Sequence, residues 1–147
     1  MANSTQFSVA IHILCFLEFY KSGRITSELL ATSVNANPAV IRRLMRKLTQ
    51  AGFIVSTLGT NANITLARPA NQLTLLDVYR AIEKEEQTDL FNIHKNTNLN
   101  CPVGSKIPNL LTGTYTQVQT SMEKELSVIT IEKLAKDLAL GISSGIL

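Results

Sequence analysis

The strongest candidate for a binding surface is a run of cations in the first third of the chain. Four positive side chains fall within six residues, and no acidic residue occurs between Glu28 and Asp77. Arginine side chains can pair with guanine edges or clamp phosphates, and a helix has the width of the DNA major groove. The pattern predicts a DNA-binding helix face, and the plainer alternative is an ordinary solvated face. The cations are Arg42, Arg43, Arg46 and Lys47.

These cations need a helix to present them, and the sequence predicts one from Pro38 to about Ala51. Asn37 can cap its start, and Pro38 is well placed at the first helical position, where its missing N–H has no consequence. The start of a helix can also point backbone N–H groups at a phosphate. We therefore add the first residues of this helix to the candidate DNA contacts, namely Asn37, Pro38, Ala39 and Val40.

A β-hairpin is predicted directly after this helix. Residues 53–57 and 64–66 have strand composition, and the segment between them is rich in turn residues. Two earlier helices, at 7–20 and 26–34, complete the order of a winged helix-turn-helix, in which the hairpin is the wing. Asn61 and Asn63 lie in the predicted turn and are candidate contacts to phosphate or sugar.

The C-terminal half predicts a different role. A fourth helix is expected from Leu73 to the acidic run at 83–86, then a loop over 87–109, a helix over 110–126 and a last helix capped by Thr130. The helix over 110–126 carries apolar residues at spacings of 4, 3 and 4, which is a coiled-coil seam and predicts a homodimer. The seam residues are Leu111, Tyr115, Val118 and Met122.

The expected fold is therefore mainly α with a small β-hairpin: a winged helix-turn-helix head plus a long C-terminal dimerisation helix. We expect a DNA-binding domain over 1–86, a hinge or sensor loop over 87–109 and a helical dimerisation region over 110–147. Residues 1–80 carry eight Lys or Arg against three Asp or Glu, whereas residues 81–147 carry six against eight. An anionic partner is thus expected for the first half only.

Other classes of protein lack support in the sequence. No phosphate-binding loop, paired catalytic carboxylates or nucleophile with a recognisable base occurs, so no enzyme is predicted. Two cysteines in 147 residues make no disulfide framework, and the apolar stretch near residue 9 is too short to span a membrane. We expect a cytoplasmic protein that has no membrane partner, no metal site and no cofactor.

The loop cysteine is the candidate sensor. Cys101 lies in a polar loop with His94 and Lys106, which could stabilise a thiolate and favour its oxidation or alkylation. The alternatives are a packed loop residue, a small-molecule pocket walled by the same loop, and no effector at all. Cys15, on an apolar helix, is expected to be a buried small hydrophobe.

Several stretches together resemble one family. Residues 37–56, NPAVIRRLMRKLTQAGFIVS, followed by Leu66–Pro69 and Leu73–Glu83, are similar to the Rrf family (Rrf-two type) of bacterial transcriptional regulators. Asn100–Gly104 looks like the cluster-free, YwnA-like branch. The resemblance covers nearly the whole chain and is densest over residues 26–83.

The resemblance implies a homodimer joined by the long C-terminal helix, with two winged heads that read a near-palindromic DNA operator, acting as a repressor. Cluster-binding members have three cysteines in the loop, whereas this chain has only Cys101, which implies that no iron–sulfur cluster is bound. Leu58 stands where the family often has a wing arginine. The alternative function is a winged-helix module that binds protein without specific DNA binding.

Overall fold

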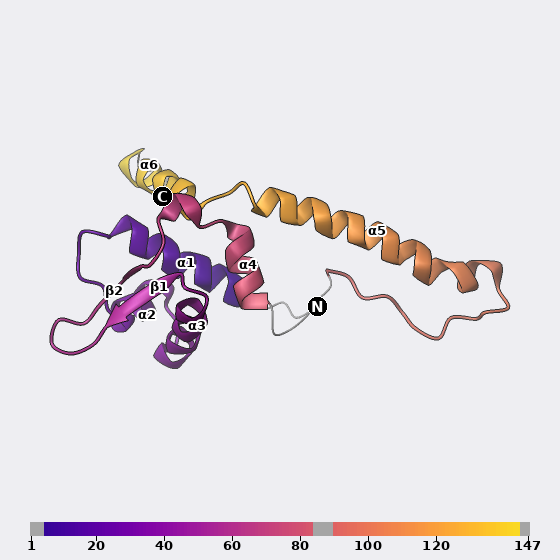
Figure 1. Ribbon diagram of the computed structural model, residues 1–147, viewed down its shortest axis with the longest axis horizontal. Helices are drawn as coiled ribbons and strands as arrows, with labels where there is room; N and C mark the ends of the chain where they lie inside the picture. The colour runs from indigo at the N-terminus through magenta and orange to yellow at the C-terminus, as the bar shows by residue number, and fades with distance from the viewer. Residues whose placement is uncertain (1–4, 84–89, 145–147) are drawn as a thin grey trace.

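The computed structural model describes residues 5–83 and 90–144. Within these residues, five α-helices and a two-stranded hairpin form a rounded head from which one further, long helix projects (Figure 1). The expected mainly α fold with a β-hairpin is confirmed. In chain order the elements are α1 (Gln6–Phe19), α2 (Ser27–Val34), α3 (Pro38–Gln50), β1 (Ile54–Thr57), β2 (Asn63–Leu66), the 3-10 turn η1 (Ala70–Gln72), α4 (Leu75–Glu83), α5 (Pro102–Leu126) and α6 (Ile131–Ser144).

Side-chain caps fix where the head helices begin. The side chain of Thr26 accepts a hydrogen bond from the N–H of Leu29 at the start of α2. A reciprocal pair of hydrogen bonds between Thr74 and Asp77 starts α4 as a capping box. Both caps are local, because each joins residues only three positions apart.

The wing is an antiparallel hairpin with Ile54 opposite Leu66 and Thr57 opposite Asn63. Gly59 has a φ of 95° in the connecting turn, a conformation that glycine adopts without strain. The N–H of Ile64 donates to the carbonyl of Ile25, 3.0 Å away, so the outer edge of β2 is tied to the segment between α1 and α2.

The core of the head is aliphatic and is organised around α1. Burial of apolar side chains is the main stabilising term in folding, and here it joins segments far apart in the chain. The fully buried large residues come from α1, α2, α3, α4 and the start of α6, with two from the connecting segments. They are Ile13, Leu14, Leu17, Ile25, Leu30, Ile41, Leu44, Leu48, Leu73, Val78 and Ile131.

The sequence predicts a dimerisation region over residues 110–147, but the structure places α6 in the head. It packs against α1, and Ile131 is fully buried in the core of the head. The N–H of Leu75 donates to the carbonyl of Ile129 and the N–H of Ile131 donates to the carbonyl of Leu73, both at 2.9 Å. The last helix therefore belongs structurally to the head.

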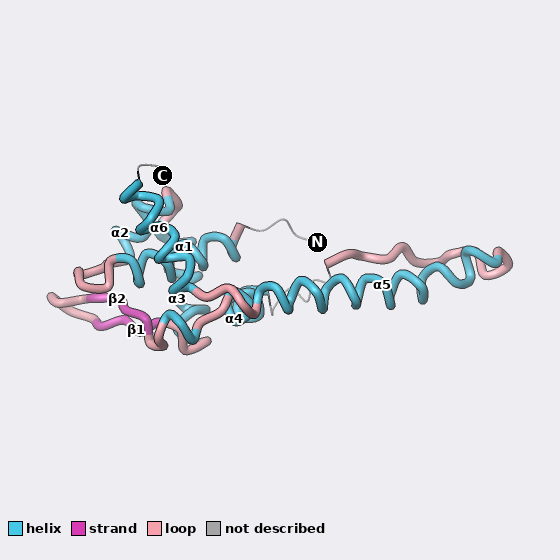
Figure 2. The backbone as a smooth tube through the Cα atoms, turned by 90° about the horizontal axis from the view of Figure 1, so that it is seen from above, coloured by secondary structure: helices cyan, strands magenta, loops and turns pink. Residues whose placement is uncertain are grey.

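Helix α5 starts eight residues earlier than predicted. The sequence places a loop over 87–109, but the helix begins at Pro102 and contains Pro108. The predicted boundary between residues 86 and 87 lies outside the described residues. Segment 90–101 runs outward from the head and α5 runs back toward it (Figures 1 and 2). No described residue of α5 is buried.

No described helix has both the length and the apolar character that crossing a membrane requires.

Candidate nucleic-acid interface

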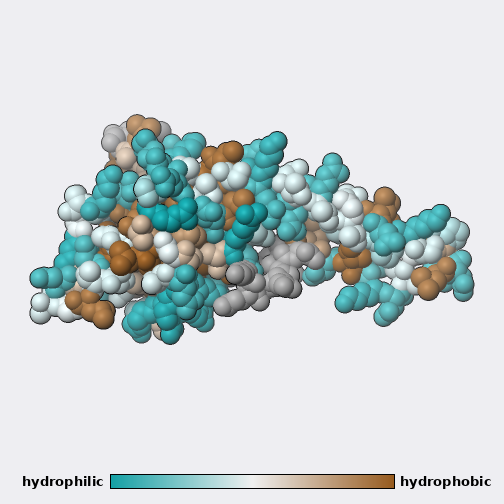
Figure 3. Space-filling model, viewed as in Figure 1, coloured by the Kyte–Doolittle hydropathy of each residue, from teal (hydrophilic) through white to brown (hydrophobic). Residues whose placement is uncertain are grey.

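The cations of α3 lie on the side opposite its buried residues. Ile41, Leu44 and Leu48 are fully buried, whereas Arg42, Arg43 and Arg46 are exposed. Hydrophilic side chains gather at the place that α3 occupies in the ribbon view (Figure 3). The helix therefore presents three guanidinium groups to a partner while its other face holds it rigidly to the head.

Lys47 is less available than these arginines. Its side chain is half-buried, and its Nζ donates to Oε1 of Gln6 on α1, 3.3 Å away. Arg42 and Arg46 are one turn apart and line a shallow hollow that Thr49 and Ser56 also line. The accessible part of the basic surface thus extends from α3 toward β1 of the wing.

The start of α3 is built as predicted, but its N–H groups already have partners. The amide oxygen of Asn37 accepts from the N–H of Ala39 at 2.8 Å, and the Asn37 carbonyl accepts from the N–H groups of Val40 and Ile41. Asn37, Pro38 and Ala39 are exposed, and the side chain of Val40 packs against the core. A DNA partner would therefore meet the exposed side chains of this turn, because the backbone N–H groups of its first residues are already hydrogen-bonded.

The two wing asparagines have different environments. Asn61 is exposed near the tip of the hairpin, next to the strongly exposed Leu58. Asn63 is half-buried, and its Oδ1 accepts from the backbone N–H of Ile25 at 2.8 Å. This amide oxygen fastens the wing to the head, so only the Nδ2 group of Asn63 remains for the predicted contact to phosphate or sugar.

A second fastening residue escapes the sequence analysis. Nε of Arg24 donates to the carbonyl of Ala62 in the wing, 2.7 Å away. Together with Asn63, this bond clamps the hairpin to the segment between α1 and α2. The sequence shows only an arginine directly after Gly23. Its partner Ala62 lies 38 positions further along the chain, so only the fold brings the two together.

Cys101 occupies the position just before the first turn of α5. The N–H groups of Gly104 and then Val103 lower the pKa of its thiol from the ordinary value of 9.0. The expected stabilising groups were instead His94 and Lys106. His94 is exposed in segment 90–101, and among the described residues the structure records no bond between it and Cys101.

Cys15 is buried as predicted, and burial raises the pKa of its thiol to about 11.

The seam of α5 is only partly covered: Leu111, Tyr115 and Met122 are half-buried, and Val118 is 43% exposed. The ring of Phe91 packs on that of Tyr115, with centroids 5.1 Å apart, so segment 90–101 covers one of the seam residues.

Three helices followed by a hairpin, with exposed arginines on the third helix, define a winged helix-turn-helix DNA-binding protein. Residues 3–137 match the Rrf2 family, described as iron-dependent transcriptional regulators. The chain belongs to the Rrf2 family. It is 42% identical to YwnA of Bacillus subtilis (strain 168), whose name places it among the HTH-type transcriptional regulators. The match covers 86% of this chain and 91% of YwnA.

Solved structures show the same fold. One, described as a DNA-binding protein, is 34% identical and superposes with a TM-score of 0.68, covering 88% of this chain and 97% of that chain. Another, the cysteine regulator CymR of Bacillus subtilis, is 17% identical with a TM-score of 0.69, covering 92% and 97%. The matched proteins are transcriptional regulators, and this chain is a DNA-binding regulator rather than an enzyme.

The iron named in the family description does not fit the residues present. Within residues 5–83 and 90–144, no three His, Cys, Asp or Glu side chains are grouped so that they could hold a metal ion. Cys101 is the only cysteine after residue 15, and iron–sulfur clusters require several thiolates. No step of the function below is therefore assigned to iron.

Proposed function

We propose that the protein is a homodimeric repressor that binds a near-palindromic DNA operator. The observation that carries the proposal is the exposed row of Arg42, Arg43 and Arg46 on a helix whose opposite face is fully buried. In this arrangement α3 enters the major groove, and its arginines contact guanine edges or phosphates. The wing, clamped by Arg24, follows the adjacent backbone of the DNA.

The proposed dimer uses α5. This helix has 25 residues, which corresponds to roughly 37 Å, and none of its described residues is fully buried, so its apolar seam is partly open to solvent. A second α5 packed along Leu111, Tyr115, Val118 and Met122 would bury the seam. Two heads related by a two-fold axis would then read two half-sites, which is why the operator is expected to be near-palindromic.

The proposed sensor is Cys101, at the junction between segment 90–101 and α5. Added bulk on this thiol would displace the first turn of α5 and with it the connection between head and dimer helix. His94 lies in the same segment but has no role in lowering the pKa of the thiol. Because half-site spacing is fixed by the operator, a small displacement here would weaken DNA binding.

The test is selection of bound DNA from a random pool with the purified protein. Enrichment of a two-fold symmetric motif, with affinity that falls steeply as salt rises, supports the proposal. The competing function is a winged-helix module that binds another protein through an apolar contact. That function predicts no enriched motif and only a weak effect of salt.

Dimerisation is tested separately with Val118→Glu. A carboxylate on the exposed seam should dissociate the dimer while leaving the head folded, because Val118 contributes nothing to the core of the head. Light scattering should show a dimer for the parent and a monomer for the variant. A parent protein that is monomeric at micromolar concentration would exclude the proposed assembly.

A further inference from the structure

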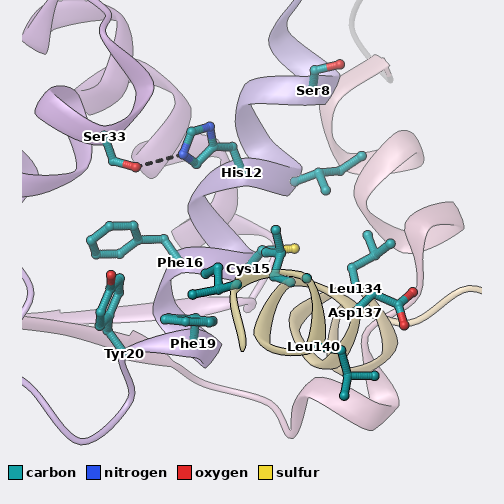
Figure 4. Close-up of a pocket in the computed structure, with 14 residues that line it drawn as sticks. Ser8, His12, Cys15, Phe16, Phe19, Tyr20, Ser33, Leu134, Asp137 and Leu140 are labelled. Atoms are coloured by element: carbon teal, nitrogen blue, oxygen red, sulfur yellow. Dashed lines mark hydrogen bonds between the residues drawn. The ribbon is translucent and has the colours of Figure 1, made fainter. Parts of the chain in front are cut away.

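A large hollow lies between α1 and α6, away from α3 and the wing. Its volume is about 980 Å³, near the upper end of the range for small-molecule sites, and its wall is mainly apolar. Figure 4 shows side chains from both helices pointing into it, with Ser33 of α2 at one edge. The sequence analysis placed a possible effector pocket at the loop instead.

One side of the hollow is aromatic. The ring of Tyr20 lies 4.8 Å from that of Phe16 and 4.7 Å from that of Phe19, measured between centroids (Figure 4). Tyr20 is 50% exposed, so this cluster is only partly covered by the chain itself. Partly exposed rings in this arrangement can take a further ring edge-on or in an offset stack, which favours an aromatic ligand.

The edge beside Phe16, one turn earlier on α1, carries hydrogen-bonding groups and little net charge. Nε2 of His12 and Oγ of Ser33 are 2.8 Å apart, and both side chains are exposed to the hollow. Asp137, the one acidic residue in the wall, is paired with Lys133 at 3.0 Å. Cys15 is uncharged at neutral pH, because burial raises its pKa to about 11. A neutral ligand with one hydroxyl or carbonyl group matches this edge.

We propose that the hollow between α1 and α6 binds a neutral aromatic small molecule with one hydrogen-bonding group, and that this ligand alters DNA affinity. Ser33 lies in the last turn of α2, which packs directly on α3. A ligand that inserts at His12 and Ser33 therefore acts on the position of the reading helix. The effect of the ligand on DNA affinity rests on the proposed DNA-binding function, whereas binding of the ligand to the hollow does not.

Binding is tested without DNA, on the full-length protein, with the neutral fluorescent probe N-phenyl-1-naphthylamine. We expect a saturable rise in fluorescence at one probe per chain. Ser8→Trp places an indole over the hollow from an exposed position of α1 and should weaken binding at least tenfold. Lys136→Trp, on α6 but outside the wall of the hollow, should change the affinity for the probe less than twofold. No saturation, or equal loss in both variants, overturns the proposal.

The same titration distinguishes a ligand from a second copy of the chain in the hollow. A covering subunit would block the probe in the dimeric parent and admit it only in the monomeric Val118→Glu variant, and that result also overturns the proposal. Binding to the parent dimer supports it.

The polar edge is tested by comparing 1-naphthol with naphthalene. A single hydrogen bond should favour 1-naphthol by about five- to tenfold, and Ser33→Ala should remove that preference. An unchanged preference in the variant contradicts the assignment of this edge. Saturable probe binding in a protein that selects no DNA motif would refute the proposed function and leave the ligand site standing.

Discussion

The hydroxyl of Thr97 donates a hydrogen bond to the carbonyl oxygen of Gly104, 2.5 Å away. Gly104 lies four residues before Pro108, and a proline has no N–H to offer the carbonyl one turn behind it. Thr97 therefore supplies the donor that the helix itself lacks. A Cβ on Gly104 would approach the carbonyl oxygen of Asn98 to 2.7 Å, so the loop packs directly on this turn.

Thr97→Val should loosen the start of α5. Valine keeps the shape of threonine but leaves the Gly104 carbonyl without its donor, at a cost of about 1 kcal/mol in local stability. Hydrogen exchange of the amides in the first two turns of α5 should become several-fold faster. Thr116→Val is the matched control, because its hydroxyl bonds only to the Thr112 carbonyl within a regular part of the helix. Equal acceleration in both variants would contradict this role for Thr97.

Arg42→Ala and Arg43→Ala should each weaken binding to the selected DNA motif by about 1–3 kcal/mol if the side chain contacts a base, and should relax preference at one base pair. A phosphate contact would instead weaken binding to all sequences and reduce the salt slope. Fluorescence anisotropy at several salt concentrations separates the two. Lys124→Ala, in the last turn of α5 and outside α3 and the wing, is the control for lost positive charge. A double alanine variant that binds as tightly as the parent would show that α3 is not the reading helix.

Arg24→Ala should loosen the tip of the wing while leaving the arginines of α3 in place. The bond from Arg24 to the Ala62 carbonyl is lost, whereas Asn63 and the backbone bond from Ile64 to Ile25 still hold β2 to the segment between α1 and α2. We expect weaker DNA protection in footprints at the positions flanking each half-site, with the central contacts kept. Arg68→Ala, whose guanidinium donates to the Gln72 carbonyl, serves as the control. Uniform loss of protection would instead indicate a general defect in the head.

Iodoacetamide should alkylate Cys101 and spare Cys15. The N–H groups of Gly104 and Val103 lower the pKa of Cys101 below 9.0, so its thiolate fraction at a given pH exceeds that of an ordinary thiol. The alkylation rate should rise with pH and reach half its maximum below pH 9.0, falling as the pH drops through the pKa. Mass spectrometry of the two peptides measures both sites. A midpoint at or above 9.0 would be inconsistent with the helix-start environment.

Local signals in the sequence were enough to predict α3 and its surface. The signals for α3 are local: a cap at Asn37, a proline at the first helical position, and apolar residues alternating with arginines. They span only a few residues, so they can be recognised without knowledge of the fold. The start of α5 was missed because Pro108 indicates a loop when read locally. Its accommodation depends on Thr97, which lies outside the helix.

The roles of Asn63 and α6 depend on contacts that no local pattern contains. An asparagine in a turn looks the same whether its amide faces solvent or accepts from Ile25, which is 38 positions away. Likewise, residues 110–147 were expected to form one helical dimerisation region, whereas Ile131 of α6 is buried in the head.

The position of Ile131 has a consequence for biosynthesis. The core around α1 lacks one of its fully buried residues until the ribosome has made the start of α6. A head made of residues 5–83 alone would leave the α1 surface that receives α6 open to water, and exposed apolar surface promotes aggregation of partly folded chains. We therefore expect the nascent protein to complete its DNA-reading head only after α6 has been made, so that chains truncated before α6 are substrates for quality control rather than competitors for the operator.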